Sequence, residues 1–200
     1  MAEVAAASLA LRDAPLDSII ILESHNGHRF PNGVVADSDI ALPLRARRWW
    51  NPNCAVRKFD KRKVCDFLNH TDLPRLPLPP EAWVGWGPGL TPAGDDAIAG
   101  MLITFHALGM KNSALALYQA CDRGATTAYS HALISYAHKG QAARPVLHLM
   151  EALAGFGDLD DAIQSLSNFG ATSGYYLMEG VRQAINVSKR RTDRCDHSTR

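Results

Sequence analysis

The stretch Gly87-Pro-Gly-Leu-Thr-Pro-Ala-Gly-Asp-Asp96 decides how the second half of this chain is built. It places three glycines, two prolines and two adjacent carboxylates in a turn that runs directly into a segment of helical apolar spacing. Glycine permits the close backbone approach and positive φ of tight turns, and proline stiffens the chain between the glycines. Thr91 is a favourable N-cap and Pro92 suits a first helical position, so the stretch predicts a rigid loop that opens a helix.

Helical periodicity continues from this loop to about residue 187. The apolar residues of the first helix share one face, namely Ile98, Met101, Leu102 and Phe105. Further stripes of the same period predict helices at about 114–121, 130–137, 146–153, 159–166 and 174–187. This part of the chain is therefore expected to be a mainly helical body.

The first eighty residues have a different character. Ser18-Ile-Ile-Ile-Leu-Glu-Ser24 is a short β-branched run, and the Asn26-Gly27 pair after it favours a hairpin turn with a returning strand. A second pair, Asn32-Gly33, precedes Val34-Val35 and predicts another turn and strand. Prolines between Pro74 and Pro80 then indicate an extended connector without helix.

Together these patterns predict an α+β fold, in which a short β-rich N-terminal subdomain precedes a mainly helical C-terminal body. Residues 1–80 form the β-rich subdomain and its proline-rich connector, 81–187 the helical body with two glycine-rich loops, and 188–200 a basic flexible tail. Within the first part, the basic run from Lys58 to Lys63 is expected to be a solvated helix face.

The composition excludes several classes of protein. The formal net charge is +1 with mixed signs, which argues against a nucleic-acid-binding or membrane-surface protein. Four scattered cysteines without a C-x-x-C pair suggest neither a zinc site nor a disulfide framework. No apolar run approaches the length of a membrane span, and the N-terminus does not resemble a secretory signal. We therefore expect a cytoplasmic protein with reduced thiols and no membrane or nucleic-acid partner.

A second glycine–hydroxyl loop, Gly170-Ala-Thr-Ser-Gly174, also opens a helix. Gly170 suits a left-handed cap of the helix before it, and Thr172 or Ser173 can cap the helix after it. Taken alone, the stretch is a helix–helix turn. If the two loops converge, amides and helix dipoles from both would face one pocket, as a bound phosphate or carboxylate requires. We predict that the loops at 87–96 and 170–174 line such a pocket.

Asp95 and Asp96 are the candidate catalytic residues. Neighbours on a helix point about 100° apart, so the two cannot act as a matched acid–base pair on one atom. One is expected to face the pocket as a general base, an amide binder or a Mg²⁺ ligand, while the other holds the loop through backbone N–H groups. In the structural alternative, both only position the turn.

The candidate substrate-binding residues are the loop glycines and the hydroxyls at the helix starts. They are Gly87, Gly89, Thr91, Gly94, Thr127, Ser130, Thr172, Ser173 and Gly174. Helix capping is the competing role for Thr127 and Ser130. The histidines and cysteines form no metal pattern, and no Walker loop or G-x-S-x-G motif occurs, so no metal site is predicted.

Several of these motifs together resemble one known family. Trp86-Gly-Pro-Gly-Leu-Thr-Pro-Ala-Gly-Asp-Asp96, with Gly100 one turn on, is similar to the motif of the family that contains one subunit of bacterial oxamate carbamoyltransferase, from anaerobic allantoin breakdown. Matches follow in order at Thr126-Thr127-x-x-Ser130 and at Gly170-x-Thr172-Ser173-Gly174, and Trp49-Trp50-Asn51-Pro52 resembles the element that often precedes the first loop. The resemblance covers residues 45–187.

The resemblance implies an enzyme that moves a carbamoyl group between oxamate and phosphate by way of carbamoyl phosphate, as an assembly of different subunits. The sequence departs from the family at two positions, with Ala171 in place of a common histidine and Tyr176 in place of an aspartate. The implied function is carbamoyl transfer, or related acyl or amide transfer, on a small anionic metabolite. No cofactor is expected, although Mg²⁺ is compatible with the site, and a homo-oligomer is compatible with the chain. Two alternatives stay open: a non-catalytic subunit of a multi-protein metabolic enzyme, and a specialised-metabolism cyclase or lyase on the same scaffold.

Overall fold

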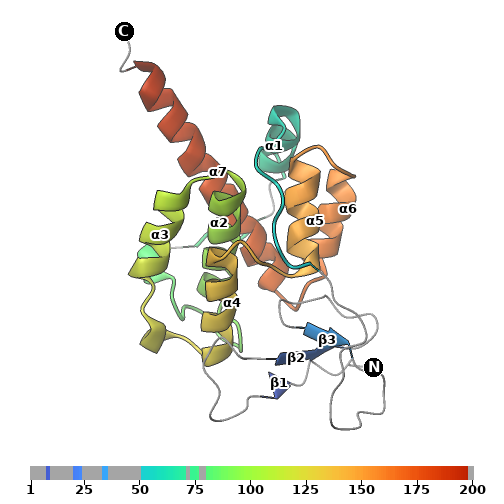
Figure 1. Cartoon of the computed structure of the whole chain (residues 1–200), viewed down its shortest axis with the longest axis vertical. Helices are drawn as coiled ribbons and strands as arrows, with labels where there is room; N and C mark the ends of the chain where they lie inside the picture. The colour runs from blue at the N-terminus through green and yellow to red at the C-terminus, as the bar shows by residue number, and fades with distance from the viewer. Residues whose placement is uncertain are drawn as a thin grey trace.

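The computed structural model describes residues 51–70, 73–76 and 80–197, and the backbone of three short strands nearer the N-terminus. Within these residues the chain is built mainly from seven α-helices (Figure 1). They are α1 (Lys61–Leu68), α2 (Ala93–Ala107), α3 (Lys111–Ala120), α4 (Ala128–His138), α5 (Arg144–Leu153), α6 (Leu159–Ser167) and α7 (Ser173–His197). Two single-turn 3-10 helices, η2 (Pro80–Ala82) and η3 (Arg123–Ala125), precede α2 and α4.

The predicted α+β fold with a β-rich N-terminal subdomain is wrong, because the described chain is helical. The strands β1 (Ser8–Leu9), β2 (Ile20–Glu23) and β3 (Gly33–Val35) contain only two, four and three residues. Such short strands cannot supply a core of their own. The predicted hairpin is also wrong, since β2 pairs with β3 in parallel, with Ile21 opposite Gly33, and antiparallel with β1.

The six helices predicted in the body are confirmed as α2 to α7, because their apolar stripes face the core. The basic run near residue 60 leads into α1, where the Asp60 carboxylate caps the helix by accepting from the amides of Arg62 and Lys63 at 2.9 and 3.0 Å. The last helix extends to His197, well beyond the end predicted near Val187. None of the described helices combines the length and apolar character that spanning a membrane requires.

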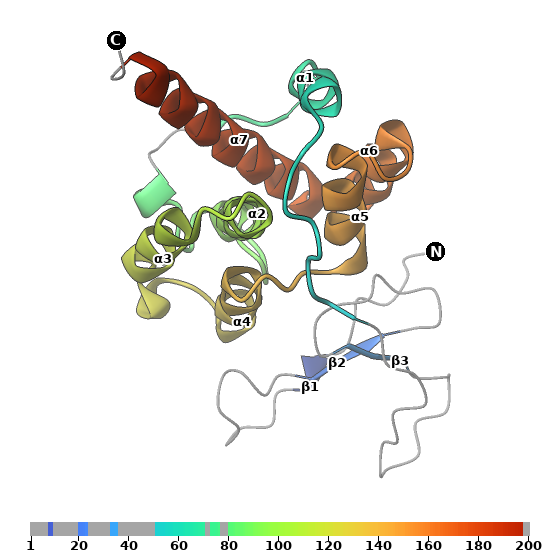
Figure 2. The same ribbon diagram turned by 45° about the horizontal axis from the view of Figure 1, so that its top comes forward.

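The core has two parts, which lie on opposite sides of α7 (Figure 2). One packs α1, α5 and α6 around fully buried residues such as Leu149 and Met150. The other packs α3 and α4 against α2, with Leu102 fully buried and Trp83 nearly so. Because α2 contributes Ile103 to the first part and Leu102 to the second, its position is fixed from both sides.

The contact between α2 and α7 is unusually close. A Cβ atom on Gly100 would overlap the carbonyl oxygen of Leu177, and a Cβ atom on Gly180 would overlap that of Ala97. The two helices therefore cross backbone against backbone, which only glycine allows. The crossing brings the first turns of both helices, and the loops before them, into one region of the molecule.

Candidate functional site

The first glycine loop has the positive φ angles that its glycines predict. Gly87 and Gly89 have φ angles of 103° and 105°, which side-chain-bearing residues rarely adopt. The helix itself begins at Ala93, with Pro92 at the N-cap and no side-chain capping bond. The predicted cap by Thr91 is therefore wrong. Its hydroxyl instead lies 3.1 Å from the hydroxyl of Ser173 in the second loop.

The prediction that the two loops lie together is confirmed. Besides the hydrogen bond between Thr91 and Ser173, the rings of Trp86 and Tyr176 meet edge to face, with their centroids 6.3 Å apart. Both contacts join residues at or before the start of α2 to residues at the start of α7. Anion binding at this junction remains a prediction, and it depends on which polar groups are free to bind a ligand.

Asp95 holds the loop in place. Its side chain is 1% exposed, and its carboxylate accepts hydrogen bonds from the amide of Gly85 at 2.8 Å, from the hydroxyl of Ser130 at 2.7 Å and from the hydroxyl of Thr126. These donors come from the segment before the loop and from the start of α4. Asp95 therefore has the loop-holding role that one of the two carboxylates was expected to have.

Several candidate substrate-binding groups are occupied by contacts within the protein. Thr127 caps α4 by accepting from the amide of Ser130 at 3.0 Å, and its hydroxyl donates to the carbonyl of Leu90 at 2.7 Å. The amide of Gly94 donates to Trp86 at 2.9 Å, and the amide of Gly174 donates to Phe169 at 3.0 Å. Thr91 and Ser173 also contact each other. A ligand would therefore be held by Gly87, Gly89 and Thr172, or would share the hydroxyls of Thr91 and Ser173.

Asp96 is also buried, but unlike Asp95 it has an oxygen without a hydrogen-bond partner among the described residues. Its side chain is 5% exposed, and Oδ2 is the oxygen that accepts no hydrogen bond from a described residue. Burial raises the pKa of this carboxyl to about 7, and the nearby charge of Asp95 adds to the rise. Hydrogen bonding to Ser173, and more weakly to Thr91, lowers the pKa and so offsets part of the effect. At neutral pH the carboxyl can therefore give or take a proton.

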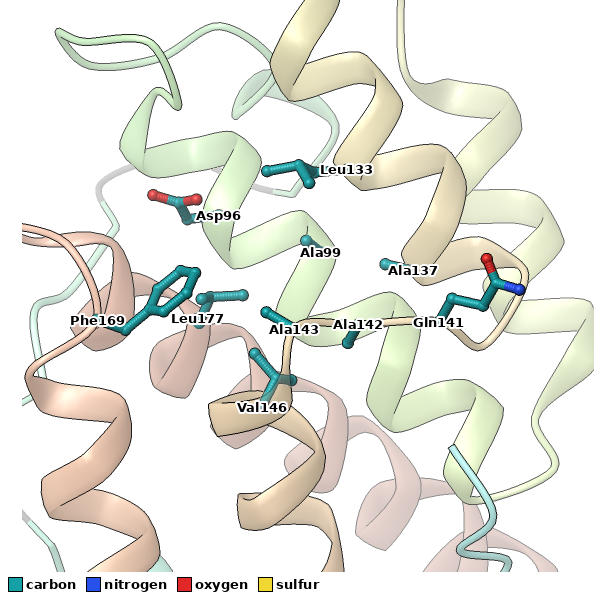
Figure 3. A pocket seen from close by; sticks show the side chains of 10 residues that line it. All are labelled: Asp96, Ala99, Leu133, Ala137, Gln141, Ala142, Ala143, Val146, Phe169 and Leu177. Atoms are coloured by element: carbon teal, nitrogen blue, oxygen red, sulfur yellow. The ribbon is translucent and has the colours of Figure 1, made fainter. Parts of the chain in front are cut away.

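A hollow of about 40 Å³, partly open to solvent, adjoins Asp96 (Figure 3). Of the ten described residues that line it, eight are apolar, and Asp96 and Gln141 are the two polar ones. Figure 3 shows these two side chains at opposite ends, with the apolar side chains between them. The lining comes from α2, α4, α5, α7 and the two connections that precede α5 and α7.

The sequence does not predict this hollow. Ala99, Ala142 and Ala143 line it because they are small, and Phe169 lines it from the turn before α7. Alanine is common in helices for reasons of propensity, so its spacing gives no indication of a cavity. Phe169 stands next to the predicted second loop, and its position there is the one signal that sequence reasoning could have used.

Other reactive groups do not form a second centre in the described part of the chain. No group of three histidine, cysteine or carboxylate side chains there is placed to hold a metal ion. Burial, with the charge of Asp95, raises the pKa of the Cys121 thiol to about 11, and burial also raises that of Cys54. Neither thiol is therefore a ready nucleophile at neutral pH.

A known family matches the part of the chain that contains this site. The family model of oxamate carbamoyltransferase subunit AllH matches residues 83–185, slightly more than half of the chain. The matched region contains both glycine loops, Asp95, Asp96 and the crossing of α2 and α7. No solved structure matches the chain.

Proposed function

Since the chain belongs to the family of oxamate carbamoyltransferase subunit AllH, we propose that it is a subunit of a carbamoyl-transferring enzyme whose reaction site lies at the two glycine loops. The observation that carries the proposal is Asp96, a buried carboxyl with a pKa of about 7 and one oxygen without a partner. Such a group is suited to proton transfer at neutral pH.

Carbamoyl transfer between nitrogen and phosphate needs a proton carrier. When a phosphate oxygen attacks the carbamoyl carbon, a C–O bond forms, the C–N bond breaks, and the departing nitrogen takes up a proton. Asp96 in its protonated form donates that proton, and the proton carried by the attacking phosphate restores it. In the reverse direction Asp96 removes a proton from the attacking nitrogen. A pKa near the working pH serves both directions.

The anionic part of the substrate is assigned to the two loops. Gly87 and Gly89 lie in the loop before α2, and Thr172 and Ser173 lie at the start of α7, where the Ser173 hydroxyl already contacts Thr91 and Asp96. Helix N-termini favour negative charge, so two of them at one junction suit phosphate or carboxylate. Residues 170–176 contain no carboxylate or imidazole, which leaves Asp96 as the proton carrier at this junction.

The decisive test compares carbamoyl transfer by the wild type and Asp96→Asn. The assay follows the release of phosphate when carbamoyl phosphate reacts with oxamate, with the purified chain and with its native complex. We expect the variant to lose activity by about 10²–10⁴-fold while it stays folded, because general acid–base catalysis contributes that much. Asp160→Asn is the matched control, since Asp160 is an exposed carboxylate in the first turn of α6. Full activity of Asp96→Asn would refute the role of Asp96.

A second candidate is the non-catalytic subunit of such an enzyme, because the matching family is described as one subunit of the carbamoyltransferase. If the native complex keeps its activity with Asp96→Asn in place, the chain is the non-catalytic subunit.

A further inference from the structure

The hollow beside Asp96 has the wrong lining for a compact anion. Eight of its ten described lining residues are apolar and none is cationic. A phosphate or carboxylate inside it would be a buried charge without a partner, which is strongly unfavourable. The negative groups of a substrate therefore belong at the loop amides, outside the hollow. What occupies the hollow must be uncharged.

The dimensions suit a short carbon chain. Four alanines, Ala99, Ala137, Ala142 and Ala143, keep the space open, and Val146, Phe169 and Leu177 supply larger apolar surfaces around it. Its volume of about 40 Å³ is room for about three water-sized groups, and the hollow is partly open to solvent, so a carbon chain can enter it and extend outward. Oxamate, which has no apolar substituent, would leave this surface uncovered.

Asp96 defines how a ligand would be oriented. Its side chain lies at one end of the hollow, and its buried Oδ2 atom has no hydrogen-bond donor among the described residues. Buried polar atoms are nearly always paired in folded proteins, so an N–H group of a ligand is the missing partner. A ligand with an amide at one end and a carbon chain at the other satisfies both Asp96 and the apolar lining.

We propose that the substrate of this chain is a carbamoyl or primary carboxamide compound that carries an alkyl substituent of several carbons, and that the hollow holds this substituent. The amide N–H donates to Asp96 Oδ2, while the alkyl group packs against Val146 and Leu177. This inference rests on the proposed function for the position of the carbamoyl group, and it adds the part of the substrate that determines specificity.

The test measures how binding changes with chain length. Acetamide, butanamide and hexanamide are titrated into the full chain by calorimetry, and methyl NMR signals of Val146 and Leu177 locate the bound amide. Affinity should rise by about fourfold for each methylene group that is buried. Ala99→Leu should remove this gain and leave acetamide affinity unchanged, because leucine fills the hollow. Ala116→Leu, the same change at an exposed position of α3, is the control. Ala142→Leu replaces Ala99→Leu if the latter lowers the melting temperature.

Three results separate this inference from the proposed function. Equal affinities for the three amides, or a chain-length gain that persists in Ala99→Leu and Ala142→Leu, would overturn the inference and leave the role of Asp96 intact. A gain that Ala99→Leu abolishes, with weaker binding of all three amides by Asp96→Asn, supports both. Hexanamide binding that is unaffected by Asp96→Asn would overturn the orientation proposed here, whereas the proposed function is decided by the activity of that variant.

Discussion

The first turns of α2 and α7 have glycines at the same positions but carry different side chains. Both helices have glycine at their second and eighth residues, which are Gly94, Gly100, Gly174 and Gly180. The eighth residue of each helix touches the carbonyl of the fifth residue of the other. At the third and fourth positions, however, α2 has Asp95 and Asp96 where α7 has Tyr175 and Tyr176. A glycine-rich helix start is therefore a packing device first, and it becomes a reactive site only through the side chains placed on it.

The largest difference between the two helix starts should appear in the pH dependence of stability, because Asp96 is on α2 alone. Its folded pKa of about 7 lies above its ordinary value of 3.8, so the folded state holds the proton longer than the unfolded state. Stability from this group is complete below about pH 4 and falls until about pH 7, by about 4 kcal/mol. Relative to wild type, Asp96→Asn should therefore become more stable as pH rises.

Urea denaturation of both proteins between pH 4 and pH 8 measures this difference. The other titrating groups are common to both proteins, so their contributions cancel when the two free energies of unfolding are subtracted. A difference that stays constant over the whole range would show that Asp96 titrates in the folded protein as it does in the unfolded chain.

Asp95 should give the next largest effect. Replacing Asp95 should destabilise the protein, whereas replacing Asp96 should stabilise it increasingly as the pH rises. Asp95→Ala leaves the donors on Gly85, Thr126 and Ser130 without their acceptor, so the free energy of unfolding should fall by about 3 kcal/mol. Urea denaturation at fixed pH measures the loss. Asp160→Ala, at an exposed position in the first turn of α6, should cost less than about 1 kcal/mol. Equal losses in the two variants would mean that Asp95 does not hold the loop.

The smallest effect is expected at the glycines where α2 and α7 cross. Gly100→Ala and Gly180→Ala each place a methyl group against a carbonyl of the other helix, and each should lower the free energy of unfolding by about 2 kcal/mol. Thermal or urea denaturation measures both. Gly124→Ala is the control, because a Cβ there would meet only Asp122 Oδ1 at 3.4 Å. Markedly unequal losses at Gly100 and Gly180 would show that the crossing is not reciprocal.

The helices could be predicted from sequence because their apolar residues recur with the helical period. The α2 face that contains Ile98 and Leu102 is buried as expected, and α5 and α6 follow the same rule. The strand pairing could not be predicted, because Asn26-Gly27 is a local turn signal, whereas the partner of β2 depends on the rest of the chain. The capping role of Thr91 failed for a similar reason, since Ser173, 82 residues later, is its partner.

The site could be predicted only in part. The sequence indicates that Asp95 and Asp96 differ in role, but which of them holds the loop depends on donors from Gly85 and α4. The loops at 87–96 and 170–174 were correctly expected to meet. The hollow could not be foreseen, because it exists through the small side chains of Ala142 and Ala143. The shape of a cavity depends on how all the elements around it pack, and the sequence alone does not show that packing.

The three donors to Asp95 lie 10, 31 and 35 residues away along the chain. The ten residues of the first loop therefore do not determine their own conformation. A graft of Gly87 to Asp96 onto another helix would supply the glycines and both carboxylates, yet it would lack Thr126 and Ser130, which give the loop its conformation. The conformation of the loop therefore depends on the position of α4. The candidate site therefore depends on the whole helical body, and the loop alone would not keep its geometry elsewhere.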